Sequence, residues 1–367
     1  MKILYLITKS EIGGAQTHVA QLVNFFVENN HEVAVMSMPG GWLENETKNS
    51  GAKFFSNNYF SNNLNPIRFF LAIKIVQKLV GEFKPDLVAC HSTAAGFIGR
   101  IAIWNSIPTI YTAHGWSFEP GTPFWRRFPA VIVEKMAAHF CKKIICVSKY
   151  TRDMGLRYKI AEQGKMVMVY NGVENPITAG VKVNNRIKII SVGRLSKQKN
   201  PELLIKVTTN LPNDLINRIE VLLVGNGPKL GMVHKLVEQN KSLLIRVLPS
   251  ATRDDIKKLL QKSDIFVLST NWEGLPYSIL EAMSVGLPVI ATDVGGISEL
   301  VDSSCGFLIK RDDGLALQRA LSSLIMDNNL RFKMGENAKK IIKNRFSINQ
   351  MLLETEKVYN TVLNNNL

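Results

Sequence analysis

Short apolar segments rich in β-branched residues alternate with longer helical segments along nearly the whole chain. In the first half, the candidate strands are KILYLI, EVAVMS, KFFS, DLVACH, TIYTAH, KIICVS and MVMVYNG. The segments between them have helical periodicity, for example AQTHVAQLVNFFVENN and NPIRFFLAIKIVQKLVGEF. Strands that alternate with helices in this way are typical of a parallel sheet whose two faces are covered by helices.

This alternation is interrupted once and then begins again. A polar, turn-rich segment, NGVENPITAGVKVNN, occupies roughly residues 171–185. After it come the candidate strands IKIISVGR, EVLLVGNG, IRVLPS, DIFVLST and PVIATD, and the chain ends in an amphipathic helix, SINQMLLETEKVYNTVL. We therefore predict an α/β fold of two Rossmann-like domains, residues 1–175 and 176–349, joined by a hinge.

The composition of the chain suits a soluble globular protein of two domains. It has 367 residues, of which 46% are hydrophobic and 20% are charged. The apolar runs are too short to cross a bilayer, and the first of them, between Lys2 and Lys9, is predicted to be a buried strand rather than a signal peptide. The four cysteines lack metal-type spacing, so we predict buried, reduced thiols in a cytoplasmic protein.

The formal net charge is +15, and much of the basic surplus of the first half lies in residues 126–165, with ten basic and three acidic side chains. Aromatic residues come just before this stretch. Aromatic side chains beside a basic cluster suit a surface that rests on anionic lipid. A nucleic-acid site and a simply solvated basic face are alternatives, but the chain contains no recognised nucleic-acid module, so we favour a membrane. The candidate acceptor or membrane residues are Trp116, Phe118, Trp125, Arg126 and Arg127.

The segment NWEGLPYSILEAMSVGLPVIATDVGG carries two carboxylates eight positions apart, Glu273 and Glu281. A Gly-Leu-Pro turn after Glu273 ends a strand and begins a helix, so Glu273 lies at the carboxyl end of the strand and Glu281 about one turn into the helix. In a doubly wound sheet this is where ligands bind. Backbone N–H groups of Gly274 and Leu275 could hold a phosphate there, and a carboxylate could accept hydrogen bonds from sugar hydroxyls. Two solvated glutamates beside a helix cap are the alternative.

The segment SVGRLSKQKN places two cations on the loop after another strand, which ends at Gly193. Arg194 and Lys199 are five residues apart, and a guanidinium and an ammonium directed at one point suit a diphosphate. The alternative is a pair of exposed cations. The segment VGNGP, at residues 224–228, is a second strand-end glycine loop that permits a ligand to approach the backbone closely. No two aspartates are separated by a single residue, so the sequence has no D-x-D metal clamp.

Among the histidines, His114 in YTAHGW is the strongest functional candidate, because it directly follows a strand. A histidine that only caps a turn is the alternative. His91 ends the preceding strand and is a weaker candidate, and His18 is interpreted as a packing or surface residue. Gly13 and Gly14 lie between the first strand and the first helix, but the full G-x-G-x-x-G pattern is absent, so NAD binding is not favoured.

Taken together, these segments resemble the family 4 retaining glycosyltransferases with the GT-B fold. The resemblance runs through GGAQTH, TAHGW, ICVSKYTRD, NGV, VGRLSKQKNP, VGNGP and EGLPYSILEAMSVGLPVIATDVGGISEL, and the last of these carries the family's E-x7-E motif. The opening TKSEIGGAQTHV further resembles enzymes that build bacterial O-antigen and capsule repeat units. The resemblance implies an acceptor-binding first domain and a nucleotide-sugar-binding second domain that face each other across a cleft, with residues 350–367 crossing back to the first.

The resemblance also implies residue roles. Arg194 and Lys199 hold the diphosphate of a sugar nucleotide, and His114 lines the reaction centre. The implied catalytic residues are His114, Arg194, Lys199 and Glu273, and the implied donor-binding residues are Gly14, Gly193, Gly225, Asn226, Leu248, Gly274, Leu275, Pro276, Ser278 and Glu281. Of these, Glu281 accepts the ribose hydroxyls. One departure, VLPS at residues 247–250 where many members have a strand ending in Leu-Gly, leaves the nucleobase open.

The expected reaction is transfer of a hexose or N-acetylhexosamine from a UDP-sugar to a polyprenyl-diphosphate-linked saccharide, with retention and without a metal or cofactor. The expected place is the inner face of the bacterial cytoplasmic membrane, with no nucleic-acid partner. Two alternatives stay open: a UDP-N-acetylhexosamine 2-epimerase-like enzyme and a non-catalytic sugar-nucleotide-binding protein. An epimerase needs carboxylates to move a proton, and we expect no acidic residue beside His114 in the strand-end loops of the first half. The sequence does not indicate the donor sugar, acceptor glycan, linkage or oligomeric state.

Overall fold

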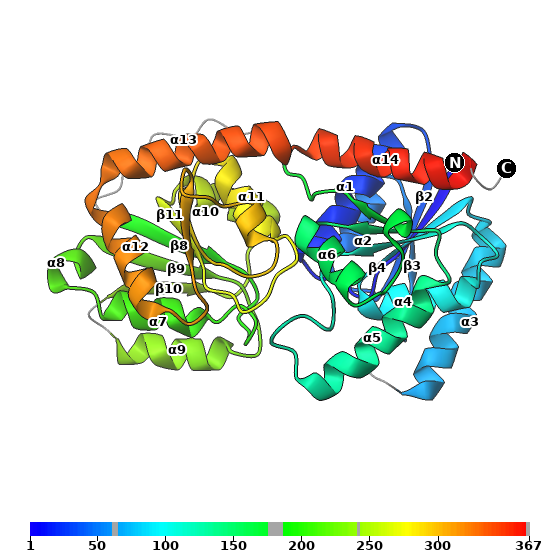
Figure 1. The fold of residues 1–367 in the computed structure, drawn as a ribbon, viewed down its shortest axis with the longest axis horizontal. Coiled ribbons are helices and arrows are strands. Elements are labelled where there is room, and N and C mark those ends of the chain that lie inside the picture. Colours follow the sequence, from blue (N-terminus) through cyan, green and yellow to red (C-terminus); the bar gives the residue numbers. More distant parts are fainter. Residues whose placement is uncertain (61–64, 175–185, 241–242, 365–367) are drawn as a thin grey trace. The chain divides into compact units, whose positions relative to one another are not determined.

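The computed structural model describes residues 1–60, 65–174, 186–240 and 243–364 (Figure 1). The chain divides into two compact units. Unit 1 comprises Met1–Asn171 with Asn349–Leu367, and unit 2 comprises Gly172–Ile348. The boundaries predicted from the sequence lay after residues 175 and 349. Most of the predicted hinge, residues 175–185, lies outside the described residues.

Unit 1 is built on a seven-stranded sheet in which every pair of neighbours is parallel. All seven strands predicted for this half are present. They are β1 (Lys2–Leu6), β2 (Glu32–Ser37), β3 (Lys53–Ser56), β4 (Leu87–His91), β5 (Thr109–Ala113), β6 (Lys143–Cys146) and β7 (Met166–Met168). The strand order is β3-β2-β1-β4-β5-β6-β7. The central strands β1, β4 and β5 are almost entirely buried, which explains why each appears in the sequence as a continuous apolar run.

The helices of unit 1 cover both faces of this sheet (Figure 1). They are α1 (Gly14–Glu28), α2 (Trp42–Asn49), α3 (Pro66–Phe83), α4 (Thr93–Ile103), α5 (Phe124–Ala138), α6 (Lys149–Arg157), the 3-10 turn η1 (Gln163–Lys165) and the final helix α14 (Ile348–Asn364). The ring of Tyr359 in α14 stacks on Phe26 of α1, with centroids 5.4 Å apart. This contact confirms the prediction that the final helix crosses back to the first domain.

Unit 2 repeats the architecture with six parallel strands. They are β8 (Ile187–Val192), β9 (Ile219–Val224), β10 (Leu244–Leu248), β11 (Ile265–Leu268), β12 (Val289–Thr292) and β13 (Gly306–Ile309). The helices are α7 (Pro201–Thr209), α8 (Asn213–Ile216), α9 (Leu230–Gln239), α10 (Arg253–Gln261), α11 (Tyr277–Ser284), η2 (Ile297–Glu299), α12 (Gly314–Met326) and α13 (Asn328–Arg345). The prediction omitted β13, a four-residue edge strand.

The strand order explains where ligands are expected. In unit 2 it is β10-β9-β8-β11-β12-β13, so the order reverses between β8 and β11, just as it reverses between β1 and β4 in unit 1. Ligands of doubly wound sheets bind outside the carboxyl ends of the strands at such a reversal. The candidate residues that follow β1, β4 and β5, and those that follow β8 and β11, therefore lie in the expected places.

Two bulk predictions can be compared with the described residues. None of the helices described is both long enough and apolar enough to span a bilayer. All four cysteines are buried and free.

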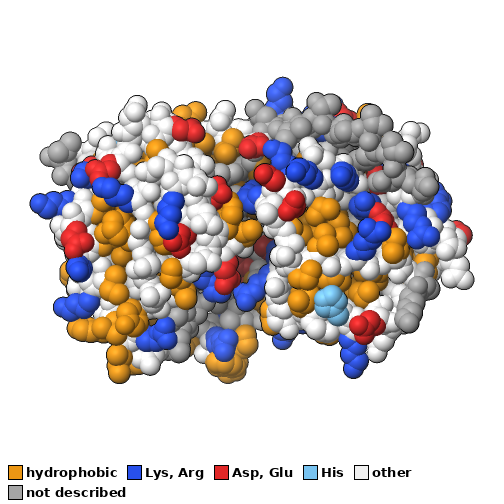
Figure 2. Space-filling view, turned by 180° about the vertical axis from the view of Figure 1, so that it is seen from behind, with side chains coloured by type: hydrophobic (Ala, Val, Ile, Leu, Met, Phe, Trp, Pro, Cys, Tyr) orange, Lys and Arg blue, Asp and Glu red, His pale blue; other side chains and the backbone are white. Residues whose placement is uncertain are grey.

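On the face of the molecule in Figure 2, Lys and Arg side chains lie among Asp and Glu side chains, so basic groups on this face are interspersed with acidic ones.

Candidate functional site

In unit 2, the loops that follow β8 and β11 are joined by a dense set of hydrogen bonds. The Asn271 backbone N–H donates to the Gln198 carbonyl oxygen at 2.7 Å, and its side-chain amide donates to the Lys197 carbonyl oxygen at 2.7 Å. In the opposite direction, Gln198 Nε2 donates to the Trp272 carbonyl oxygen at 2.8 Å. Because the backbones are held at several points, the side chains that the two loops carry have defined relative positions.

These bonds bring Lys199 and Glu273 together. Lys199 Nζ lies 2.5 Å from Glu273 Oε1, and the Thr270 hydroxyl donates to the same oxygen at 2.9 Å. Glu273 is only 8% exposed, and the stem of Lys199 passes Gly193, where a Cβ would lie 3.3 Å from Lys199 Cε. An ammonium fixed in this way needs little reorganisation to meet an anionic ligand.

Arg194 differs from Lys199 in its surroundings. Its side chain is exposed, and within the described parts of the chain it forms no ion pair. Its loop is held against the glycine loop after β9, because the Leu195 N–H donates to the Asn226 carbonyl oxygen at 2.9 Å. Gly225 has φ +141°, and a Cβ there would lie 2.1 Å from the carbonyl oxygen of Gly193. Gly225 therefore permits the two loops to touch, in addition to any role toward a ligand.

Glu281, the second carboxylate of the motif, is paired with a residue that the sequence analysis missed. Arg253 Nη2 donates to Glu281 Oε1 at 2.6 Å. Although 21% of the Glu281 side chain is exposed, desolvation raises the pKa of its carboxyl group above the usual range, and the Arg253 guanidinium opposes this. A capping box of Thr252 and Asp255 fixes the first turn of α10, and with it the backbone of Arg253.

The turn between the two carboxylates is supported by the glycine pair of the TDVGG segment after β12. Gly295 has φ +63°, and a Cβ there would lie 1.8 Å from the carbonyl oxygen of Glu273. The Gly296 N–H donates to the Gly274 carbonyl oxygen at 2.9 Å. Gly295 had no role in the sequence analysis, although its place in the motif was visible.

The remaining donor-site candidates of unit 2 lie on the same elements. Gly274 and Leu275 are buried in the turn, and Pro276 is the N-cap residue of α11. Ser278 is in the first turn of that helix and is partly exposed, near the positive end of its dipole. Leu248 ends β10, and its carbonyl oxygen accepts the Gly225 N–H at 2.8 Å.

In unit 1, three histidines form a cluster at the carboxyl ends of β4 and β5. His91 Nδ1 lies 3.1 Å from His114 Nε2, and the His18 ring, on α1, lies with its centroid 5.0 Å from that of His114. His18 and His91 are fully buried, whereas His114 is partly exposed. Burial lowers the pKa of all three imidazoles, that of His18 to about 4, so the cluster is neutral at pH 7.

Thr8, which follows β1, and Ser92, which follows β4, are hydrogen-bonded to each other at the reversal point of the unit 1 sheet. The Thr8 N–H donates to Ser92 Oγ at 3.0 Å, the two hydroxyls lie 2.6 Å apart, and Thr8 Oγ1 accepts the Ala95 N–H at 3.0 Å. The sequence analysis named neither residue. Gly14, the first residue of α1, is exposed at the same edge of the sheet.

The structure corrects the expectation that Trp116 and Phe118 belong to a lipid-facing surface. Both side chains are buried, their rings are stacked with centroids 5.3 Å apart, and Trp116 Nε1 donates to the Thr151 carbonyl oxygen at 2.7 Å. Arg127 is also engaged, because its guanidinium donates to the Phe118 carbonyl oxygen and to the Tyr158 hydroxyl. These residues hold the loop after β5 in the core.

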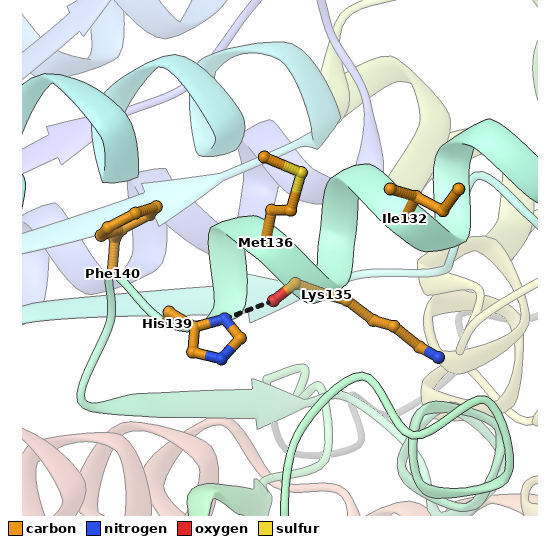
Figure 3. Close-up of a pocket in the computed structure, with 5 residues that line it drawn as sticks. All are labelled: Ile132, Lys135, Met136, His139 and Phe140. Atoms are coloured by element: carbon orange, nitrogen blue, oxygen red, sulfur yellow. Dashed lines mark hydrogen bonds between the residues drawn. The ribbon is translucent and has the colours of Figure 1, made fainter.

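A different row of side chains on α5 is exposed. Phe124, Phe128, Ile132 and Met136 recur every four residues, and each is more than two-fifths exposed. Trp125 and Arg126 are exposed as well, with the guanidinium 4.7 Å from the indole ring. Figure 3 shows Ile132, Met136 and Phe140 around a surface pocket of about 320 Å³, together with Lys135 and His139. The four-residue spacing was the signal that the sequence analysis overlooked.

The expectation that no acidic residue accompanies His114 was wrong. Glu119 lies in the loop that follows β5, five residues beyond His114. It is buried, and its Oε1 accepts the Trp116 N–H at 3.1 Å. Among the residues that the structure describes, no group of three or more His, Cys, Asp and Glu is arranged to hold a metal ion.

Comparison with known proteins identifies the family. Residues 12–175 match the family described as Glycosyltransferase Family 4, and residues 176–341 match the family described as Glycosyl transferases group 1. The chain is a family 4 glycosyltransferase with the GT-B fold. The two matched regions meet between residues 175 and 176, where the sequence analysis placed its domain boundary.

Two relatives of this glycosyltransferase have names that state an activity or a pathway. The UDP-Gal:alpha-D-GlcNAc-diphosphoundecaprenol alpha-1,3-galactosyltransferase of Escherichia coli is 27% identical over 98% of this chain and 96% of its own length. The capsular polysaccharide biosynthesis glycosyltransferase CapM of Staphylococcus aureus is 27% identical over 81% of this chain and 83% of its own length.

Solved structures support the fold. Alr3699/HepE of Anabaena, crystallised with UDP and glucose, superposes with a TM-score of 0.84 at 19% identity, over 98% of this chain and all of its own. WaaG, a glycosyltransferase involved in lipopolysaccharide biosynthesis, superposes with a TM-score of 0.75 at 17% identity, over 99% of each chain.

Proposed function

We propose that this glycosyltransferase transfers a hexose or N-acetylhexosamine from a UDP-sugar to a polyprenyl-diphosphate-linked saccharide during synthesis of a bacterial surface polysaccharide, with retention at the anomeric carbon. The observation that carries the donor half of this proposal is the ion pair of Lys199 and Glu273 at the reversal point of the unit 2 sheet, on a loop that also carries the exposed Arg194. The acceptor half is supported by the name of the Escherichia coli relative, a galactosyltransferase that acts on GlcNAc-diphosphoundecaprenol.

In the proposed reaction, unit 2 stabilises the leaving group. As the bond between the sugar and UDP breaks, negative charge grows on the β-phosphate. The exposed guanidinium of Arg194 and the fixed ammonium of Lys199 face this charge, and the positive end of α11 adds to their effect. Because Lys199 is partly neutralised by Glu273, Arg194 supplies the uncompensated positive charge of the site.

The proposed route to retention needs no protein nucleophile. The acceptor hydroxyl attacks the anomeric carbon from the side that UDP leaves, and the departing β-phosphate oxygen takes its proton. The carbon–oxygen bond to UDP breaks as the new glycosidic bond forms, so the products are UDP and the extended glycan. Glu281 accepts hydrogen bonds from the ribose hydroxyls, Glu273 contacts the donor sugar, and His114 contacts the reacting sugar.

We further propose that the enzyme binds the inner face of the cytoplasmic membrane through α5. The exposed row Phe124, Phe128, Ile132 and Met136 gives an apolar face, and Arg126 and Lys135 add positive charge on the same helix. An amphipathic helix of this kind lies in the membrane interface, where it buries its apolar face and attracts anionic headgroups. This position suits an enzyme whose acceptor is anchored in the bilayer.

The experiment that tests the reaction is a panel of UDP-, GDP- and ADP-sugars, each incubated with a polyprenyl-diphosphate-linked N-acetylhexosamine and analysed by mass spectrometry and NMR. The proposal expects a mass increase of one sugar with a UDP-linked donor only, and an α-linkage from an α-linked donor. An inverted linkage, or no product with any donor, would contradict it. Incubation with UDP-N-acetylglucosamine alone gives a 2-epimer only if the epimerase alternative is correct.

Membrane attachment is tested by flotation with vesicles of phosphatidylglycerol and, separately, of phosphatidylcholine. Replacing Phe128, Ile132 and Met136 together by Ser should reduce binding to the anionic vesicles at least tenfold, because the apolar area buried in the interface is lost. The matched control is Phe332→Ser, which removes an exposed aromatic side chain from α13 of unit 2. Equal loss in both variants, or none in the triple variant, would show that α5 is not the attachment surface.

A further inference from the structure

The hydrogen bond between His91 and His114 holds one proton between two ring nitrogens. The nitrogen to which this proton is bound determines the tautomer of both rings. His91 Nδ1 and His114 Nε2 are 3.1 Å apart, within hydrogen-bond distance. One nitrogen must donate and the other must accept, since two bare lone pairs or two N–H groups would repel. Both rings are kept neutral by burial, so the direction of this bond fixes which nitrogen of each ring carries the proton.

The surroundings of His91 decide between the two directions. His91 is completely buried, and its Nε2 has no hydrogen-bond partner within the described residues. If His114 donated, neutral His91 would carry its own proton on Nε2, and a buried N–H would be left without an acceptor. If His91 Nδ1–H donates, Nε2 is only an unused lone pair, which is the less costly of the two arrangements.

The neighbouring side chains support this choice. The ring of Tyr5 in β1 lies with its centroid 5.8 Å from that of His91, and the His18 ring lies 5.6 Å away. Burial and the neighbouring rings of His114 and His18 lower the pKa of His91, and none of these is a carboxylate that would retain a proton on its Nε2. The rings of His18 and Tyr5 also restrict the rotation of His91, so its Nδ1 stays directed at His114.

The consequence for His114 follows directly. Its Nε2 accepts a hydrogen bond from His91 Nδ1–H, so the proton of the neutral His114 ring is on Nδ1. Free neutral imidazole side chains favour the opposite tautomer, with the proton on Nε2, so His91 reverses the ordinary preference. His114 is the one partly exposed member of the cluster, and it can therefore present Nδ1–H to a ligand but cannot accept a proton at that nitrogen.

We propose that His91 is a positioning residue that holds His114 as its Nδ1–H tautomer, so that His114 serves sugar transfer as a hydrogen-bond donor and not as a base. The proposal rests on the proposed role of His114 in the reaction. It agrees with a retaining route in which the leaving phosphate takes the acceptor proton, because such a route requires no basic imidazole.

The first experiment measures the tautomer itself. Two-bond 1H–15N correlation spectra of the full-length protein, labelled with 15N-histidine, distinguish Nδ1–H from Nε2–H rings, and the His114→Asn variant identifies the His114 signals. The expected result at pH 7.5 is Nδ1–H for His114 in the wild type. In His91→Leu, which removes the donor, the His114 signals should shift to Nε2–H. Nε2–H in the wild type, or an unchanged tautomer in His91→Leu, would overturn the proposal.

The second experiment compares two substitutions of His91. An Asn side chain places its amide nitrogen near the position of His Nδ1, so His91→Asn should keep the bond and lose less than threefold in kcat. His91→Leu should lower kcat by about tenfold to a hundredfold, the range typical of residues that orient a functional group, with the KM for the UDP-sugar unchanged. His234→Gln, on the exposed face of α9, is the control and should match the wild type.

These measurements separate the inference from the proposed function. If His114→Asn retains full activity, His114 has no role in transfer, yet the spectra still report its tautomer. If His114→Asn is inactive but His91→Asn and His91→Leu lose kcat equally, His91 acts through packing alone and the inference is wrong. Circular dichroism and thermal unfolding of each variant show whether a loss comes from failure to fold.

Discussion

The two Rossmann-like units present opposite electrostatics at corresponding places. At the reversal point of unit 1, the functional candidates are neutral imidazoles, and His91 is hydrogen-bonded to His114. At the reversal point of unit 2, they are ion pairs, Lys199 with Glu273 and Arg253 with Glu281. The same strand order therefore supports two different kinds of chemistry.

The two kinds of group suit two different parts of a ligand. A pyrophosphate carries concentrated negative charge and needs cations that are already in place, which the interlocked loops of unit 2 supply. A sugar hydroxyl is neutral, and a charged group beside it would have to be desolvated without compensation. The cluster in unit 1 offers hydrogen bonds without charge. Substitutions in one unit at a time test this contrast.

The largest effect is expected from removing the ammonium of unit 2. Lys199→Ala should lower kcat by about 10²–10³, because a fixed donor to the leaving group is lost. It also leaves the Glu273 carboxylate, only 8% exposed, without its counter-charge. Steady-state kinetics with the UDP-sugar identified by the panel would measure the change.

The control is Lys197→Ala, two positions earlier in the same loop. Its side chain is exposed, and the bond that it makes to Asn271 uses only its backbone carbonyl, so activity should be retained. Activity of Lys199→Ala within threefold of the wild type would mean that the ion pair of unit 2 is structural and that the contrast with unit 1 has no catalytic meaning.

Acid should destabilise unit 1 through its buried histidines. The pKa of His18 is about 4 in the folded protein and 6.5 in its ordinary state, so between these values the unfolded chain binds a proton that the folded chain does not. The contribution of His18 to the free energy of unfolding is therefore complete above pH 6.5. It decreases as the pH falls, by about 2 kcal/mol at pH 5. Hydrogen exchange resolved by peptide, corrected for intrinsic rates, would measure it in each unit.

Replacing His18 by Gln should flatten this dependence in unit 1, whereas His234→Gln in unit 2 should leave it unchanged. His18→Gln also alters a hydrogen bond to Asn171, so its stability at pH 7.5 serves as the reference for its own curve. If the stability of unit 1 in the wild type does not change between pH 7.5 and pH 5, the clustered histidines bind protons in the folded protein as readily as in the unfolded chain. The contrast between neutral imidazoles in unit 1 and ion pairs in unit 2 would then be wrong.

The backbone support of unit 2 gives a smaller effect. Gly295→Ala places a Cβ 1.8 Å from the Glu273 carbonyl oxygen at a φ of +63°, so the turn that carries Glu273 must shift. We expect a loss of about 1–3 kcal/mol in stability and an increase of roughly tenfold in the KM for the donor. Gly231→Ala is the matched control, because nothing lies within 4 Å of a Cβ at that position. Unchanged donor binding in Gly295→Ala would show that the turn does not depend on this contact.

The sequence predicted the strands well for a physical reason. Strands buried on both faces must be apolar throughout, and such runs are visible without knowledge of the fold. The sequence also placed His114, Arg194 and Glu273 just after strands, whereas the strand order that defines the reversal points came from the structure. The edge strand β13 was missed because four residues give too short a pattern, and it is less buried than the central strands.

Pairings between elements could not be predicted in the same way. Arg253 and Glu281 are 28 residues apart on different helices, and only the packing of α10 beside α11 makes them partners. Aromatic residues beside a basic cluster gave the same pattern whether they faced the core, as Trp116 does, or solvent, as Trp125 does. Orientation is a property of the folded chain that composition does not contain.

The smallest effect concerns the second ion pair of unit 2. Arg253→Leu removes the guanidinium that lowers the pKa of Glu281, so desolvation acts alone and the pKa rises further. A neutral carboxyl group accepts hydrogen bonds from ribose hydroxyls less well than a carboxylate. Affinity for UDP, measured by calorimetry, should therefore fall by about threefold to tenfold at pH 7 and should weaken more steeply than in the wild type as the pH decreases. Arg246→Leu, an exposed change on β10, is the control. If Arg253→Leu binds UDP with the affinity and pH dependence of the wild type, Glu281 keeps its charge without help, and the ion pair belongs to the packing of α10 on α11.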